Sequence, residues 1–233
     1  MEFTVAARLE EAGVTFVGFA EACFEFWADF VGCLVNARAD RRRDVCCAVF
    51  AHQRDGIFEY AGDRAFPARV RSGDDAMCLK TGVRRGLTSV TVKDSFFSGS
   101  SGGSNGIKFG TASYGAFKDI KVQDAYVKDI QYAAMAVESR QGADVNAVAF
   151  RRIELANVGS AFFVYLAQQA STHPAGDVPK LGTMNDVSFT DIAGATAGWP
   201  NSPHQGSLIT GHVYNGTTYR ITNLGFTNVA VTW

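Results

Sequence analysis

A repeat of apolar and polar positions from residue 90 onward constrains the fold more than any other feature of the chain. The repeat is anchored at five apolar residues: Val90, Ile120, Val148, Val187 and Leu224. Two positions after each anchor the residue is again apolar, in the order Val92, Val122, Phe150, Phe189 and Phe226. Four positions after each anchor the residue is polar: Asp94, Asp124, Arg152, Asp191 and Asn228. The anchors are 30, 28, 39 and 37 residues apart, so a fixed unit recurs with connections of variable length.

Alternating apolar positions predict that each unit is a strand with one buried face. The connections are rich in Gly, Ser, Asn and Asp and carry no helical pattern, which excludes a βαβ fold. The remaining solution is a solenoid in which each circuit of the chain lays a strand on the previous one. Polar residues at the bends would form hydrogen bonds to the polar residues at the same position in the preceding and following circuits. We therefore predict an all-β fold, a parallel β-helix, with the second apolar position of every unit in one inward column.

The repeat fails upstream of Val70, where it would require Asp63 as an anchor and would place Pro67 inside a strand. Residues 19–31 instead have apolar residues near helical spacing and predict an amphipathic helix. Two interpretations of residues 1–68 stay open. They form a helical cap over the open first edge of the solenoid, or they come from a wrong start or a shifted reading frame. Residues 69–233 are expected to form the β-helix.

Composition excludes several classes of protein. The chain of 233 residues is 47% hydrophobic and carries a net charge of −1, which favours one globular core and gives no sign of nucleic-acid or membrane binding. Acidic residues interrupt the apolar stretch 12–37, so we expect no transmembrane helix, and because the N-terminus is acidic we expect no secretory signal there. The five cysteines have neither a disulfide framework nor the spacing of a metal site.

Two adjacent carboxylates, Asp74 and Asp75, lie between Gly73 and a short apolar run. In isolation such a pair is typical of a solvated turn. It is also the arrangement that acid–base chemistry needs, because two close like charges raise the pKa of one carboxyl and keep it protonated. Neighbouring strand residues point to opposite faces, so both carboxylates reach one cleft only if the backbone bends or bulges near Gly73.

Four motifs stand out between residue 72 and residue 189: Ser72-Gly-Asp-Asp-Ala-Met-Cys-Leu-Lys-Thr-Gly82, Asn105-Gly-Ile-Lys-Phe-Gly-Thr-Ala-Ser-Tyr-Gly115 with Phe117-Lys-Asp-Ile120, Val158-Gly-Ser, and Asp177-Val-Pro-Lys-Leu-Gly-Thr-Met-Asn-Asp-Val-Ser-Phe189. In these motifs the chain resembles glycoside hydrolase family 28, the polygalacturonases, within the pectin-lyase-like right-handed β-helices. The resemblance covers about residues 69–233 and implies that they form a partial hydrolase domain.

The resemblance implies an inverting glycosidase that hydrolyses O-glycosidic bonds in pectic polysaccharide. Asp74 would be the general acid, and Asp75 would be one of the carboxylates that activate water on the opposite face of the sugar. It implies no cofactor and no metal, a pectic or related acidic polysaccharide as partner, a monomer, and a secreted or periplasmic location. The exact polymer and endo or exo action stay open.

The chain departs from the family pattern at three places. The family has a third aspartate, and the nearest candidate for it in this chain is Asp55, in Gln53-Arg-Asp-Gly-Ile57. Where the family has a His-Gly pair, this chain has Asn105-Gly106. The family's Arg-Ile-Lys motif, which binds a galacturonate carboxylate, is replaced in this chain by Ala136-Val137-Glu138. An acidic residue in place of a basic one argues against a simple polygalacturonan substrate. Lys108 and, less directly, Lys80 are candidates for the missing positive charge, because Lys108 alternates with apolar neighbours and should point outward. Tyr114 is a candidate for stacking on a sugar ring.

Two further functions stay open. A catalytically impaired, carbohydrate-binding β-helix fragment is favoured by the absent histidine and the doubtful third aspartate. A β-helix lyase would use calcium and a basic residue, and it ranks last because no acidic cluster beyond the pair resembles a calcium site.

Overall fold

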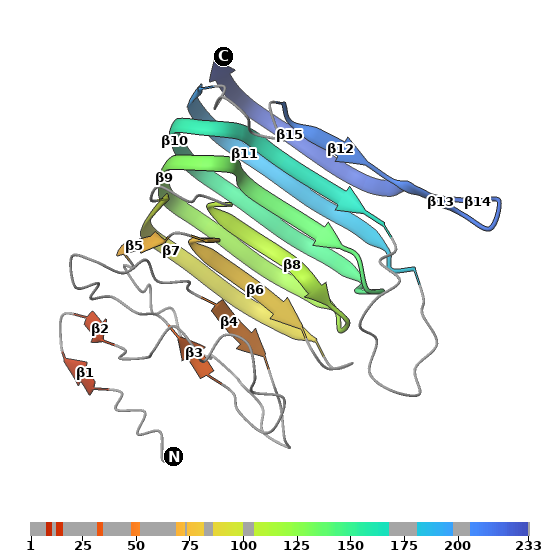
Figure 1. The fold of residues 1–233 in the computed structure, drawn as a ribbon, viewed down its shortest axis with the longest axis horizontal. Coiled ribbons are helices and arrows are strands. Elements are labelled where there is room, and N and C mark those ends of the chain that lie inside the picture. Colours follow the sequence, from red (N-terminus) through yellow and green to blue (C-terminus); the bar gives the residue numbers. More distant parts are fainter. Residues whose placement is uncertain are drawn as a thin grey trace.

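The described part of the chain is built from β-strands, and it contains no helix (Figure 1). The computed structural model describes residues 8–10, 13–15, 32–34, 48–51, 69–72, 74–81, 86–99, 105–167, 181–197 and 206–232. No helix in these ranges could cross a membrane.

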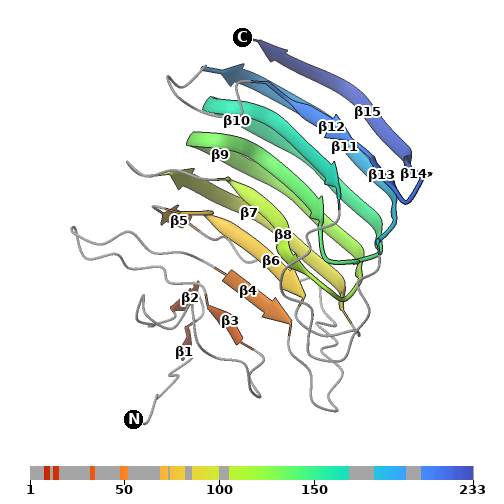
Figure 2. The ribbon, with the colours of Figure 1, turned by 45° about the vertical axis from the view of Figure 1, so that its right-hand side comes forward.

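The strands in chain order are β1 Arg8–Glu10, β2 Gly13–Thr15, β3 Gly32–Leu34, β4 Ala48–Ala51, β5 Arg69–Ser72, β6 Met77–Thr81, β7 Leu87–Gly99, β8 Ile107–Ser113, β9 Phe117–Ser139, β10 Val145–Leu166, β11 Met184–Thr196, β12 Leu208–Thr210, β13 His212–Tyr214, β14 Thr217–Tyr219 and β15 Ile221–Thr232. Eleven of them form one mostly parallel sheet, whose main path is β15-β11-β10-β9-β8-β6-β4-β3. Figures 1 and 2 show these strands side by side from β6 to β15. The pairs β1–β2, β3–β4 and β13–β14 are antiparallel.

The strand register confirms the repeat derived from the sequence. The five anchors pair with one another in one row across β7, β9, β10, β11 and β15. The second apolar positions pair in another row, two residues further along the same strands. Within that row the rings of Phe150 and Phe189 stack with their centroids 5.0 Å apart, and those of Phe189 and Phe226 are 5.2 Å apart. Phe150 and Phe189 are fully buried, whereas Phe226 on the outermost strand β15 is 42% exposed. The predicted column is therefore present and becomes solvent-exposed at its β15 end.

The polar row of the repeat marks sharp bends in the backbone, as predicted. All five of its residues have left-handed backbone conformations, with φ between 51° and 56°: Asp94, Asp124, Arg152, Asp191 and Asn228. Asp and Asn tolerate this conformation better than other residues with a Cβ atom. Neighbours in the row are also bonded to each other, because Asn228 Nδ2 donates to Asp191 Oδ1 at 2.8 Å and the Arg152 guanidinium donates to both oxygens of Asp124. The bends thus recur at matching positions in successive strands.

The long strands take part in two stacks of paired segments. The first stack contains β5, β7, the first halves of β9 and β10, β11 and β15. The second stack contains β4, β6, β8, the second halves of β9 and β10, and β12. Aromatic rings from both stacks meet in the core. The ring centroids of Phe109 and Phe150 are 5.8 Å apart, and those of Phe162 and Phe189 are 4.8 Å apart. One face of the second stack therefore covers the core, and its other face is available for a site.

The predicted helix at residues 19–31 lies outside the described residues. Within residues 1–68 the structure describes only the short strands β1 to β4. Strand β4 pairs in parallel with β6, with Ala48 opposite Cys78 and Ala51 opposite Thr81. The two interpretations of residues 1–68 stay predictions.

Candidate functional site

Asp74 and Asp75 lie in a bend between β5 and β6, outside any strand. The amide of Asp74 donates to Ser72 Oγ at 3.1 Å, and the amide of Asp75 donates to Asp74 Oδ1 at 2.8 Å. Side-chain acceptors of this kind stabilise a turn in place of a sheet ladder. Because the backbone bends here, the two carboxylates are released from the strict alternation of a strand, and both line the same cavity. The bend required by the sequence analysis is present.

Asp75 is a buried carboxylate that accepts hydrogen bonds from the next strand connection. It is 7% exposed, and its Oδ1 accepts from the backbone amide of Asn105 at 2.9 Å and from Asn105 Nδ2 at 2.8 Å. Asn105 is fixed in turn, because its Oδ1 accepts from the Ala133 amide at 3.2 Å. The neighbouring Gly106 has no room for a side chain, since a Cβ atom there would lie 2.7 Å from the Ala134 carbonyl oxygen. The Asn-Gly pair thus positions Asp75 by bonding and by close packing.

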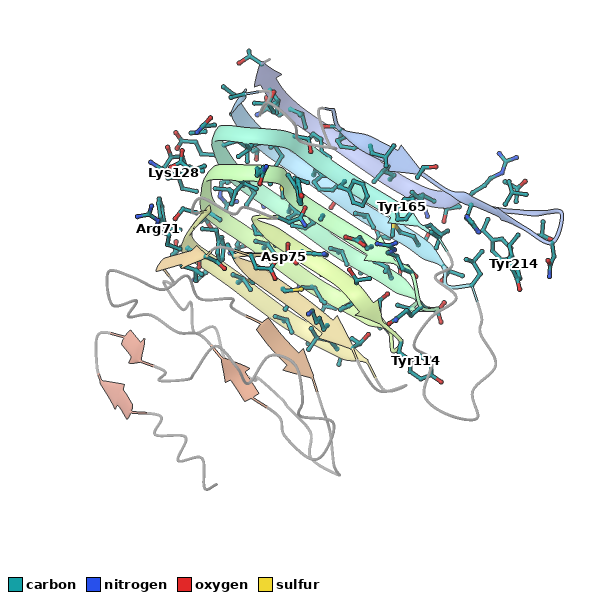
Figure 3. All side chains as sticks on the ribbon, viewed as in Figure 1. Arg71, Asp75, Tyr114, Lys128, Tyr165 and Tyr214 are labelled. Carbon is teal, nitrogen blue, oxygen red and sulfur yellow. The ribbon has the colours of Figure 1, made fainter. Side chains whose placement is uncertain are left out.

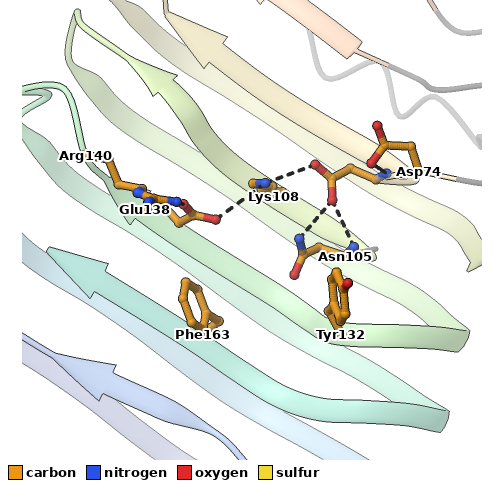
Figure 4. A pocket seen from close by; sticks show the side chains of 8 residues that line it. Asp74, Asn105, Lys108, Tyr132, Glu138, Arg140 and Phe163 are labelled. Carbon is orange, nitrogen blue, oxygen red and sulfur yellow. Dashed lines mark hydrogen bonds and ion pairs between the residues drawn. The ribbon is translucent and has the colours of Figure 1, made fainter. Parts of the chain in front are cut away.

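Lys108 connects Asp75 to a second acidic residue. Its Nζ lies 3.2 Å from Asp75 Oδ2 and 3.6 Å from Glu138 Oε1. The other oxygen of Glu138 lies 3.4 Å from Arg140 Nη1, and the Arg140 guanidinium also lies over the Tyr165 ring at 5.5 Å. Asp75, Lys108, Glu138 and Arg140 thus form a row of alternating charge from the bend before β6 to the end of β9. Figure 4 shows Lys108, Glu138 and Arg140 in that order. Lys108 points outward between the buried Ile107 and Phe109, as the alternation predicted.

The pKa of Lys108 is raised above its ordinary value. Burial lowers this pKa, but the carboxylates of Glu138 and Asp75 more than offset that cost. Lys108 is therefore an ammonium ion at neutral pH. Because its folded pKa exceeds its unfolded pKa, it contributes stability in full below the unfolded pKa and loses that contribution as the pH rises through the folded pKa.

Replacing Lys108 with methionine should lower the free energy of unfolding by about 1–3 kcal/mol, because it leaves Asp75 and Glu138 buried without their shared cation. Urea unfolding at neutral pH would measure this loss. The double variant Lys108→Met with Glu138→Gln should lose less than the sum of the two single variants, since the residues interact directly. Strict additivity of the two changes would contradict the described network.

The cavity beside this row has a volume of about 250 Å³. Eight residues line it: Asp74, Asp75, Asn105, Lys108, Tyr132, Glu138, Arg140 and Phe163. The rings of Tyr132 and Phe163 lie on one side of the charged row (Figure 4). The site therefore combines an exposed carboxyl, two buried carboxylates, two cations and an aromatic side. Because most of the residues that line it are charged or polar, the site suits a small group that can form hydrogen bonds. Among the described residues, no group of His, Cys, Asp and Glu is arranged to hold a metal ion.

The structure brings together five of the residues selected from the sequence, namely Asp74, Asp75, Asn105, Lys108 and Glu138. Lys80 and Tyr114 are not among the residues that line the cavity. Tyr114 follows the carboxyl end of β8, whereas Asn105 precedes its amino end, and Figure 3 shows Tyr114 far from Asp75. The seven residues of β8 separate these ends by roughly 20 Å. Asp55 lies outside the described residues.

Sequence analysis missed three lining residues: Tyr132, Arg140 and Phe163. Phe163 pairs with Ala136, and Ala136 pairs with Lys108. Phe163 therefore lies in the same row of the second stack as Lys108. The repeat index could not find this row, because a register shift between Val158 and Ser160 changes the phase of the pattern. Arg140 carried a usable signal, since it is two positions from Glu138 and strand alternation places such residues on one face.

Comparisons of this chain with protein-family models, with curated proteins and with solved structures found no match.

Proposed function

We propose that this protein is an inverting glycoside hydrolase of the polygalacturonase type that acts on pectic polysaccharide, built on a right-handed parallel β-helix. The observation that carries the proposal is the placement of exposed Asp74 and bonded Asp75 side by side in one cavity on the outer face of the second stack. The rows of paired residues and the recurring bends support the β-helix, because a chain that coils regularly repeats both at each circuit.

The two carboxyl groups suit different roles. Asp74 is exposed and would donate its proton to the glycosidic oxygen as the bond from that oxygen to the anomeric carbon breaks. Asp75 accepts hydrogen bonds from Asn105 and is paired with Lys108, which fits a carboxylate that takes a proton from the attacking water. Water then attacks from the opposite face, and the product has the inverted configuration. Asp55 would be the third carboxylate of this mechanism.

A direct assay of the products tests the proposal. Incubation with homogalacturonan, rhamnogalacturonan and galactan should release new reducing ends from at least one polymer, without the ultraviolet absorbance of an unsaturated sugar. Proton NMR of the first product should show the inverted anomer. An unsaturated product would identify a lyase and contradict the hydrolase.

A binding β-helix without turnover is the second candidate. It is favoured by the engagement of Asp75, whose Oδ1 accepts two hydrogen bonds and whose Oδ2 is paired with Lys108. Such bonding also suits a carboxylate that only holds the local structure. Retention of the protein on a pectic polymer with no new reducing ends would establish this function instead.

A further inference from the structure

The charges that line the cavity leave no surplus of positive charge for an acidic ligand. The lining contains Lys108 and Arg140 against Asp74, Asp75 and Glu138, so the formal sum is 2 − 3 = −1. When Asp74 carries the proton that a general acid requires, the sum becomes zero. A free uronate in this cavity would therefore meet a lining with a net charge of zero or below.

Both cations are already engaged by carboxylates of the chain. Lys108 lies between Asp75 and Glu138, and Arg140 is paired with the second oxygen of the same Glu138. The side chains of Lys108, Asp75 and Glu138 are 15%, 10% and 5% exposed, so water screens these pairs weakly. A uronate could gain Lys108 only by competing with Asp75 and Glu138. At Arg140, whose Nε has no hydrogen-bond partner, it would still add a like charge close to Glu138. Repulsion between these like charges disfavours binding of a uronate.

The remaining wall of the cavity suits an uncharged sugar. Tyr132 and Phe163 provide apolar rings against which a sugar ring can pack (Figure 4). The charged row opposite them offers donors and acceptors for hydroxyl groups, and hydrogen bonds to charged groups are the stronger class. The cavity thus has the partners that a neutral sugar needs.

We propose that the cavity takes a neutral glycosyl unit and discriminates against a free uronate, with Glu138 as the residue that sets this specificity. This inference rests on the proposed function, since it concerns the sugar that occupies the same site. Glu138 acts by holding Lys108 and Arg140, which would otherwise attract a carboxylate.

Two ligands that differ in charge and in the ester methyl groups test the inference: an oligomer of α-1,4-linked galacturonate and its fully methyl-esterified form. Titration calorimetry at neutral pH would use the Asp74→Asn variant, which prevents turnover and reproduces the uncharged state of residue 74. The esterified oligomer should bind at least about tenfold more tightly than the free acid. In the same background, Glu138→Gln should strengthen binding of the free acid at least about tenfold, because both cations lose their shared counter-charge.

Glu154→Gln provides the matched control, because it makes the same chemical change at an exposed residue of β10 outside the cavity. It should leave both affinities unchanged. If the Asp74→Asn protein binds the free acid as tightly as the ester, or more tightly, the inference is overturned. This result does not depend on the Glu138→Gln variant, so the test still decides if Glu138→Gln fails to fold. Failure of both oligomers to bind would also overturn it. The hydrolase proposal is judged separately, by release of reducing ends from the three polymers.

Discussion

Replacing Asp74 with asparagine should lower kcat by a factor of about 10²–10⁴, because the amide cannot donate the proton that the leaving oxygen needs. The substitution should preserve the local structure. Asp74 Oδ1 accepts from the Asp75 amide at 2.8 Å, and the amide oxygen of asparagine can accept the same bond. Because Asp74 is exposed, the polymer should still bind. Release of reducing ends under saturating substrate would measure kcat, and titration calorimetry would measure binding.

An unchanged urea midpoint in the Asp74→Asn variant would show that the loss of activity is chemical. A kcat within tenfold of the unmodified chain would rule out Asp74 as the general acid. A parallel loss of binding would assign the residue to substrate contact instead, since an acid that acts only in the transition state affects kcat and leaves binding intact.

The corresponding change at Asp75 is a less selective experiment. If Asp75 activates water, as the family resemblance implies, Asp75→Asn should cause a comparable loss of activity. The structure adds a second effect, because Asp75 accepts from two donors of Asn105 and pairs with the Lys108 ammonium. An amide group would place an N–H donor against one of these donors, which costs stability as well as activity. Asp74 is therefore the better residue for separating chemistry from folding.

The repeat could be derived from the sequence because its causes are local. Alternation of apolar residues follows from the geometry of a strand, and the polar bend residues follow from the preference of Asp and Asn for the left-handed conformation. These two local rules aligned Phe150 with Phe189, which pair across β10 and β11, and Asp191 with Asn228, which are joined by a side-chain hydrogen bond. They fail beyond Val158, where the register shifts, and for that reason Phe163 was not assigned to the site.

The candidate site depended on information that local rules do not carry. Sequence analysis selected Asn105, Lys108 and Glu138 as separate positions, each in relation to a motif. Their function in the structure comes from cross-strand contacts, since Asn105 binds Asp75 and Lys108 lies between Asp75 and Glu138. Partners of this kind are set by register and by bends between strands. The sequence predicts which residues face outward, but only the register determines which of them pair.

Replacing Phe150 with alanine should lower the free energy of unfolding by about 3–5 kcal/mol, through lost burial and the cavity that remains. Phe150 is 0% exposed, its ring stacks on that of Phe189 at 5.0 Å, and it meets the Phe109 ring edge-on at 5.8 Å. Because Phe109 belongs to the second stack, the substitution removes a contact that joins the two stacks, so the surrounding structure can relax only in part. Urea unfolding followed by circular dichroism would measure the loss.

Phe226→Ala is the matched control, because Phe226 occupies the same row and stacks on the other side of Phe189 at 5.2 Å but is 42% exposed. Its loss should be smaller, about 1–2 kcal/mol, since part of its surface is in water in the folded state. Equal losses for the two variants would contradict the assignment of Phe150 to the core between the stacks. A larger loss for Phe226 would mean that the outermost strand is covered in solution.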